Sequence, residues 1–200
     1  MQKYNHGNMY GKQGGFSLVE LMVAVTIFVI VMIISVSTLL VIIDANAKAQ
    51  AVNTAMNNIS FAVDSITRNI RTSNSFYCAS SLGSTLPASS ATADCPNGER
   101  QGAVAFTRDV DSRRWGYRFN NGKIEQRIED KNGNEEVDWL SITSPDVVVT
   151  TFTVTVIGSV RGDYTQPEVS LLIKGYVVNG LDINTDFTLQ TSAVQRIIDL

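Results

Sequence analysis

The chain has 200 residues, of which 44% are hydrophobic and only 18% are charged. Soluble domains carry roughly a quarter of charged residues, so the charged share is low. The formal net charge of −3 gives no broad electrostatic attraction to nucleic acid. The length predicts one or two domains. Two cysteines are too few for a scaffold built on disulfides.

The first fifteen residues are mostly polar, and their two charged residues, Lys3 and Lys12, are both basic. By the positive-inside rule, this end is expected to stay in the cytoplasm and the remainder to face outside the membrane. A secretory signal has its small-residue cleavage site after the apolar stretch, whereas here Gly14-Gly15 precedes it. Cleavage at these glycines would therefore leave the apolar helix on the product.

A run without any charge, glycine or proline extends over residues 21–43. About 20 apolar residues are enough to cross the hydrocarbon core of a bilayer. The run therefore excludes an ordinary cytosolic globular protein and predicts a membrane-spanning segment over residues 16–44.

A short motif, GGFSLVEL over residues 14–21, leads into this run. Together with the basic leader, it resembles the class III signal of type IV prepilins and type II secretion pseudopilins. The resemblance implies that a membrane aspartyl prepilin peptidase removes leader 1–15 by cutting between Gly15 and Phe16, and N-methylates Phe16. It also implies other pilin or pseudopilin subunits and an inner-membrane assembly platform as partners.

The apolar run departs from many major pilins, which carry a helix-breaking proline midway along this segment. The run in this chain contains no proline. The departure favours a minor pilin or pseudopilin, and the resemblance is to the W type of minor pilin or the J type of pseudopilin.

Glu20 is an acid at the start of an apolar helix, where such a group costs about 2.5–3.5 kcal/mol at the bilayer centre. Cleavage would create a cationic amine on Phe16 near the same depth. We expect Glu20 to pair with the Phe16 amine of a neighbouring subunit and so to set the axial register of a filament. The alternative is a plain anchor, in which Glu20 reaches toward the lipid headgroups and marks the interface.

Loss of residues 1–15 would also remove His6, the single histidine of the chain. Without histidine the processed product has no Ser-His-Asp or Cys-His catalytic set and no histidine-ligated zinc. The sequence therefore predicts a structural protein and not an enzyme.

The helical pattern continues beyond the apolar run without glycine or proline. Apolar residues recur at spacings of three and four, which is typical of an amphipathic helix: Val52, Met56, Ile59, Val63, Ile66 and Ile70. We predict one helix from about Ser17 to Arg71, with an amphipathic half over residues 45–71. The alternative is two helices with a joint near residues 44–48.

Residues 72–102 are rich in serine and threonine, include Pro87 and Pro96, and show no periodicity. Such a stretch predicts a long surface loop. Cys78 and Cys95 lie in it, and outside the cytoplasm two cysteines are expected to form a disulfide. Two free thiols and a metal-binding pair are the alternatives.

The remainder of the headpiece, residues 72–200, predicts β-strands. Trp115, Tyr117 and Phe119 alternate with smaller or basic residues, and Asn121-Gly122 indicates a tight hairpin turn. The expected strands cover residues 103–107, 114–119, 123–128, 147–160, 169–178 and 187–198. The predicted fold class is therefore α+β, with the long N-terminal helix packed on an antiparallel sheet.

Oxygen-bearing side chains alternate in one acidic stretch: Asp130, Asn132, Asn134, Glu136 and Asp138. Calcium prefers clustered oxygen ligands, so a calcium site is one expectation here. The other is an acidic turn between strands without any cofactor, since asparagine and glycine favour turns.

Four arginines, at positions 108, 113, 114 and 118, surround Trp115 and Tyr117. Basic residues interleaved with aromatics can bind single-stranded nucleic acid. Because the aromatics fall on one face of the expected strand and the arginines on the other, we expect instead that the aromatics face the core and the arginines form a solvated face. The acidic net charge also disfavours nucleic-acid binding. A singly anchored binding module, such as an adhesin or a receptor for calcium or DNA, remains the alternative function.

Overall fold

The computed structural model describes residues 14–160, 165–178 and 185–196. Most of the predicted leader therefore lies outside the described residues. The chain divides into two compact units, Met1–Ala47 and Lys48–Leu200, and each is treated by itself. We call the second unit the headpiece.

Helix α1 extends from Leu18 to Arg71 without interruption, which confirms the prediction of one long helix. The sequence between these ends contains no glycine or proline to stop it. The two-helix alternative with a joint near residues 44–48 is therefore wrong at the level of secondary structure.

Within the headpiece, one face of α1 is buried along a stripe made of Ala55, Ile59, Ala62, Ile66 and Ile70. The predicted stripe is right at its three isoleucines. The other two buried positions are the alanines Ala55 and Ala62, which are not among the predicted members. Of the other predicted members, Met56 and Val63 are partly buried and pack against the edge of the core.

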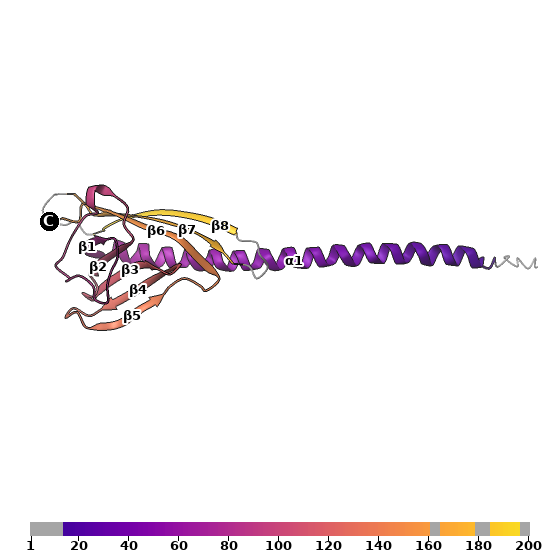
Figure 1. Ribbon diagram of the computed structural model, residues 1–200, viewed down its shortest axis with the longest axis horizontal. Coiled ribbons are helices and arrows are strands. Elements are labelled where there is room, and N and C mark those ends of the chain that lie inside the picture. The colour runs from indigo at the N-terminus through magenta and orange to yellow at the C-terminus, as the bar shows by residue number, and fades with distance from the viewer. Residues whose placement is uncertain (1–13, 161–164, 179–184, 197–200) are drawn as a thin grey trace, which may run out of the picture. The chain divides into compact units, whose positions relative to one another are not determined.

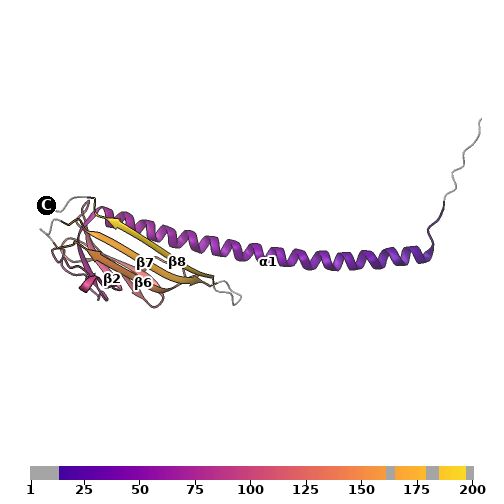
Figure 2. The same cartoon turned by 90° about the horizontal axis from the view of Figure 1, so that it is seen from above.

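The described residues form eight strands in two antiparallel sheets, which confirms the α+β fold. The five-stranded sheet has the order β1-β2-β3-β4-β5, and the three-stranded sheet has the order β6-β7-β8. Figure 1 shows the strands of the first sheet side by side, and Figure 2 shows β7 and β8 next to the helix. The strand bounds are β1 Ser73–Ala79, β2 Ala103–Arg108, β3 Arg114–Asn120, β4 Lys123–Glu129, β5 Glu135–Ser141, β6 Val147–Ile157, β7 Glu168–Val177 and β8 Thr185–Val194.

The Asn121-Gly122 turn joins β3 to β4 as predicted. Asn120 pairs with Lys123 across it, and both turn residues have positive φ angles, 46° for Asn121 and 76° for Gly122. Asparagine and glycine tolerate this left-handed backbone, which the tight hairpin turn requires.

The expectation that residues 72–102 form only a loop is wrong, because β1 occupies Ser73–Ala79. The pairing of β1 with β2 shifts between Asn74 and Tyr77, and Ser75 between them has a φ of 51°. Such a bulge breaks the alternation of apolar and polar residues on which strand prediction depends. The short 3-10 helix η1, Pro96–Gly98, lies in the same stretch.

The acidic turn predicted over residues 130–138 is also shorter than expected, because β5 begins at Glu135. The register between β4 and β5 shifts at Gln126/Ile128 and again at Ile128/Glu129. These irregularities explain why β5 has no clear period-two pattern in the sequence.

The headpiece has two apolar clusters. The larger one joins α1 to both sheets and includes Ile59, Ile66, Phe76, Tyr117 and Phe152. The smaller one lies beneath the loop that follows β1, and consists of Leu82, Leu86, Ala103 and Ala105, with Tyr77, Ala79 and Trp139 packed against them. The loop after β1 is therefore packed into the folded core through its leucines.

Candidate functional site

The predicted cleavage site lies immediately before α1. Residues 14–17 have no regular secondary structure, and the first bond of the helix joins the Leu21 N–H to the Ser17 carbonyl at 3.1 Å. The space around Gly14 and Gly15 is open, because a Cβ added to either residue would have no atom within 4 Å. Phe16 is 83% exposed. The Gly15–Phe16 bond thus lies in accessible chain outside the helix.

Glu20 lies in the first turn of α1 and is exposed, as are its apolar neighbours Leu18, Val19 and Leu21. A carboxylate at a helix N-terminus interacts favourably with the helix dipole. Within the described part of the chain, no basic side chain forms an ion pair with Glu20.

The part of α1 over residues 18–43 has an almost wholly apolar and exposed surface. Four hydroxyl groups interrupt it, and each donates to the carbonyl four residues earlier in the helix, at 2.8–2.9 Å. These are the hydroxyls of Thr26, Ser35, Ser37 and Thr38. The helix is long and apolar enough to cross a membrane by length and composition.

A comparison with family models matches residues 10–36 to the prokaryotic N-terminal methylation motif. No curated protein and no solved structure matches the chain. The motif supports the resemblance of the N-terminal segment to type IV pilin-like prepilins. The motif points to a structural protein and implies interaction with other pilins and with a prepilin peptidase. With the apolar helix, it indicates a single-pass membrane anchor.

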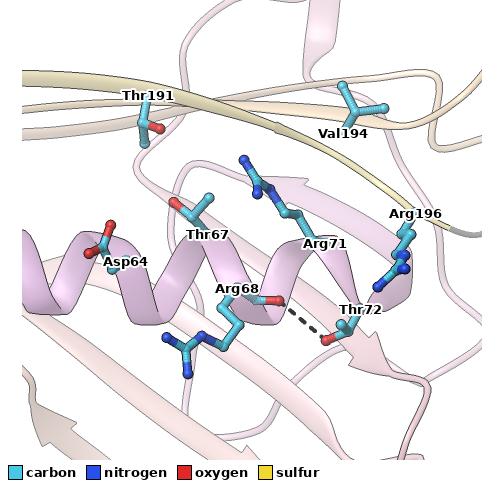
Figure 3. A pocket seen from close by; sticks show the side chains of 8 residues that line it. All are labelled: Asp64, Thr67, Arg68, Arg71, Thr72, Thr191, Val194 and Arg196. Carbon is cyan, nitrogen blue, oxygen red and sulfur yellow. Dashed lines mark hydrogen bonds between the residues drawn. The ribbon is translucent and has the colours of Figure 1, made fainter.

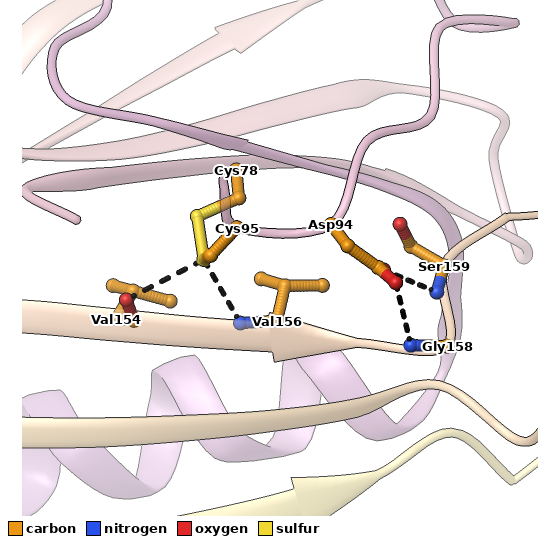
Figure 4. The surroundings of a disulfide bond; sticks show 7 residues. All are labelled: Cys78, Asp94, Cys95, Val154, Val156, Gly158 and Ser159. Atoms are coloured by element: carbon orange, nitrogen blue, oxygen red, sulfur yellow. Dashed lines mark hydrogen bonds between the residues drawn. A yellow bond between two sulfur atoms is a disulfide. The ribbon is translucent and has the colours of Figure 1, made fainter. Parts of the chain in front are cut away.

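In the headpiece, Cys78 of β1 and Cys95 form a disulfide with a Cα–Cα distance of 5.0 Å. The structure thus contains the predicted pair, and the alternatives of free thiols or a metal pair do not hold here. Both cysteines are buried, at 6% and 4% exposure. Figure 4 shows the disulfide above β6, where the Cys95 Sγ accepts a hydrogen bond from the Val156 N–H at 3.1 Å.

Arg114 contradicts the expectation of a solvated arginine face, because it is only 2% exposed. Its guanidinium donates to the carbonyls of Ser75, Pro87 and Ala91 at 2.6–3.2 Å, and to Thr107 Oγ1 at 3.0 Å. Burial lowers the pKa of Arg114 to about 10, so the group is still cationic at neutral pH. Hydrogen bonds from Arg114 therefore hold the loop after β1 against the five-stranded sheet.

Two further arginines near Trp115 are engaged as well. Arg108 pairs with Asp111 and lies over the Trp115 ring, 4.7 Å from its centroid. Arg118 pairs with Glu125 at 2.9 Å and lies 3.9 Å from the centroid of the Trp139 ring. The arginines therefore do not form the row of solvated cations that the DNA-binding alternative requires.

The carboxylate of Asp130 accepts hydrogen bonds from within its own turn. Both the Asn132 and Asn134 N–H groups donate to Asp130 Oδ1 at 2.8 Å. The hydrogen bond from the Asn134 side-chain amide, together with these backbone bonds, lowers the pKa of Asp130. Asp138 pairs with Arg127 at 2.6 Å instead of facing the turn. The Glu136 side chain lies outside the described residues.

Three of the five residues expected to bind calcium, Asp130, Asn132 and Asn134, thus lie in one turn, whereas Asp138 pairs with Arg127. Among the described side chains, no group of three or more His, Cys, Asp or Glu residues is placed to hold a metal ion. No cofactor is indicated by this part of the molecule.

A cavity of about 700 Å³ lies between the end of α1 and β8, and Figure 3 shows the side chains that line it. Arg68 and Arg71 lie in the last turn of the helix, where cations compensate the helix dipole. The Arg196 N–H donates to the Arg71 carbonyl at 3.0 Å, and Asp64 adds a negative charge to the lining. The arrangement caps a helix terminus, and we assign no ligand to it.

Proposed function

We propose that this protein is a minor pilin or pseudopilin, a structural subunit of a type IV pilus or a type II secretion pseudopilus. The observation that carries the proposal is the methylation motif at residues 10–36 on a helix whose apolar side chains are exposed. Such a surface is stable in lipid or among like helices, and in water it is not. The lack of a proline in the apolar segment supports the minor subunits, of W or J type.

In the proposed mechanism the helix first anchors the precursor in the inner membrane, with the leader in the cytoplasm and the headpiece outside. Prepilin peptidase cuts between Gly15 and Phe16 and methylates the new Phe16 amine. The assembly platform then moves the subunit into a bundle of like helices. There Glu20 pairs with the Phe16 amine of a neighbour, which offsets the cost of burying both charges.

A Glu20→Val variant tests assembly directly. The proposal predicts normal insertion and cleavage but loss of the subunit from sheared or purified filaments, measured by immunoblot in the native host. Glu99→Val is the matched control, since Glu99 is an exposed acid in the headpiece, and it should enter filaments like the wild type.

The alternative, a singly anchored binding module that never polymerises, makes the opposite prediction. Under it, the Glu20→Val protein is displayed at the membrane as before, and neither variant nor wild type is found in filaments. Recovery of the Glu20→Val variant in filaments at the wild-type level would contradict the proposed role of Glu20.

A further inference from the structure

Strand β6 has a sequence that pairs readily with other strands. Its residues, VVVTTFTVTVI over Val147–Ile157, are β-branched or aromatic, without a charge, a glycine or a proline. One edge of β6 pairs with β7 along ten residue pairs. A long uncharged edge of this composition would template association with another chain if it were left open.

Residues 94–101, which we call the strap, cover the other edge of β6 at Val154 and Val156. Nearer the start of the strand, the Val149 N–H on this edge donates to the Gly122 carbonyl at 2.8 Å. The Gln101 N–H donates to the Val154 carbonyl at 2.8 Å, and the Val154 N–H donates back to the Gln101 carbonyl at 2.7 Å. Two residues further along, the Cys95 N–H donates to the Val156 carbonyl at 3.1 Å. The strap thus satisfies backbone groups that a neighbouring strand would otherwise satisfy.

The carboxylate of Asp94 extends this cover past the end of β6. It accepts the Gly158 N–H at 3.1 Å and the Ser159 N–H at 2.7 Å. Figure 4 shows Asp94 next to the disulfide on the same side of β6. Between the two points of attachment, residues 96–100 are exposed and contribute no core contacts. The strap is therefore held mainly at its two ends.

The disulfide is the covalent part of the attachment near Asp94. It joins Cys95 to Cys78 of β1, so it ties the strap to the five-stranded sheet while the strap covers the three-stranded one. Two thiols cannot remain at the distance of a covalent bond and must separate to van der Waals contact. Because Cys95 is only 4% exposed and its surroundings are close-packed, that separation has to displace it from β1 or from β6.

We propose that the Cys78–Cys95 disulfide is a redox-sensitive clasp on the strap, and that its reduction opens the edge of β6 at Val154 and Val156 to pairing with β6 of a second copy of this chain. The reductant is a dithiol. It supplies two electrons and two protons, the Sγ–Sγ bond breaks, two S–H groups form, and the dithiol becomes a cyclic disulfide. The inference concerns the headpiece and does not depend on the proposed filament.

The direct test is amide hydrogen exchange of the full chain in detergent micelles, before and after reduction with dithiothreitol. We expect exchange at the Val154 and Val156 amides to accelerate about 100-fold, as loss of a disulfide-closed loop allows. Leu171, in the middle of β7, should change far less. Equal acceleration in β6 and β7 would mean general destabilisation and would overturn the proposal, as would unchanged protection of Val156.

A double variant, Cys78→Ser with Cys95→Ser, removes the clasp without any intermolecular disulfide. It should behave like the reduced wild type and form dimers in sedimentation at a fixed detergent ratio, whereas the oxidised wild type stays at its lower mass. Adding Thr155→Lys places a charge on β6, which opposes pairing between copies, so the triple variant should lose protection but not dimerise. A double variant that does not dimerise contradicts the proposal.

Asp94→Asn is the control that keeps the disulfide. It weakens the bonds to the Gly158 and Ser159 amides, so exchange should accelerate at these two positions and remain slow at Val156. Acceleration at Val156 in this variant would show that Asp94, and not the disulfide, holds the strap, and the proposal would fail.

Discussion

Residues 14–47 and the headpiece differ in the exposure of the apolar side chains that they place on α1. In the first region, Phe28, Ile33 and Leu39 are each more than half exposed, whereas Ile59, Ile66 and Ile70 in the headpiece are fully buried. Both groups lie on α1, so the difference does not come from helix formation. It shows that the headpiece buries the apolar side chains of its own part of the helix, whereas the apolar side chains of the first region are exposed.

The largest effect is expected from charges placed in the first region. Val29→Lys with Ile33→Lys adds two cations to the apolar surface, each costing about 2.5–3.5 kcal/mol near the bilayer centre. We expect the protein to leave the membrane fraction on ultracentrifugation. Asn53→Lys with Asn57→Lys adds the same charges to exposed positions of α1 in the headpiece and should leave membrane association unchanged. If both variants associate with the membrane to the same extent, the contrast between the two regions of α1 is wrong.

A pair of substitutions on one helix separates buried from exposed residues within the headpiece. Ile66→Ala removes a side chain with 0% exposure and should cost about 2–5 kcal/mol of unfolding free energy. Phe61→Ala removes a side chain that is 76% exposed and should change the unfolding free energy by less than about 0.5 kcal/mol. Urea unfolding followed by tryptophan fluorescence measures both, because both tryptophans lie in the headpiece. A large cost at Phe61 would mean that α1 faces the sheets differently.

Arg114→Met tests how the loop after β1 is held. It removes the guanidinium that donates to three carbonyls and one hydroxyl, and we expect a loss of about 2–4 kcal/mol of unfolding free energy. Amide exchange in residues 86–92 should accelerate more than in β7. Arg100→Met, at an exposed position, is the matched control and should have little effect. If the loop stays protected in Arg114→Met, the other contacts of the loop are sufficient to hold it.

The smallest effect concerns pH. The hydrogen bond from Arg108 lowers the pKa of Asp111 in the folded state, so this carboxylate stabilises the fold above its unfolded pKa of about 3.9. That contribution is lost as the pH falls through the lowered folded pKa. Asp111→Asn should therefore cost about 0.5 kcal/mol at pH 7, since the pair is partly exposed, and nothing near pH 2. A cost that stays constant from pH 7 to pH 2 would exclude an ionic origin.

Periodicity was sufficient to predict α1 and the regular strands β2, β3, β4, β6 and β7. It could not predict β1 or β5, because bulges interrupt their alternation. Arg114 was misplaced for a different reason. Its alternation with Trp115 and Tyr117 indicated a face exposed to water, and the pattern carries no sign that the loop after β1 folds over that face.

For the N-terminal segment, the sequence is more informative than the structure. Its function is indicated by a short motif and a composition, and the structure adds only that the motif is accessible and that Glu20 has no described partner. The calcium site stays a prediction. The Asp130 carboxylate accepts hydrogen bonds from the Asn132 and Asn134 N–H groups and so closes a turn, which spacing alone does not distinguish from a metal site.

The central claim is that the chain is a prepilin whose leader is removed. Co-expression with a prepilin peptidase, followed by intact-mass and N-terminal analysis of the membrane fraction, tests it most directly. The account predicts a product that begins at Phe16, lacks residues 1–15 and carries one added methyl group on the amine. An unchanged mass, with Met1 to Gly15 still attached in the presence of active peptidase, would contradict it.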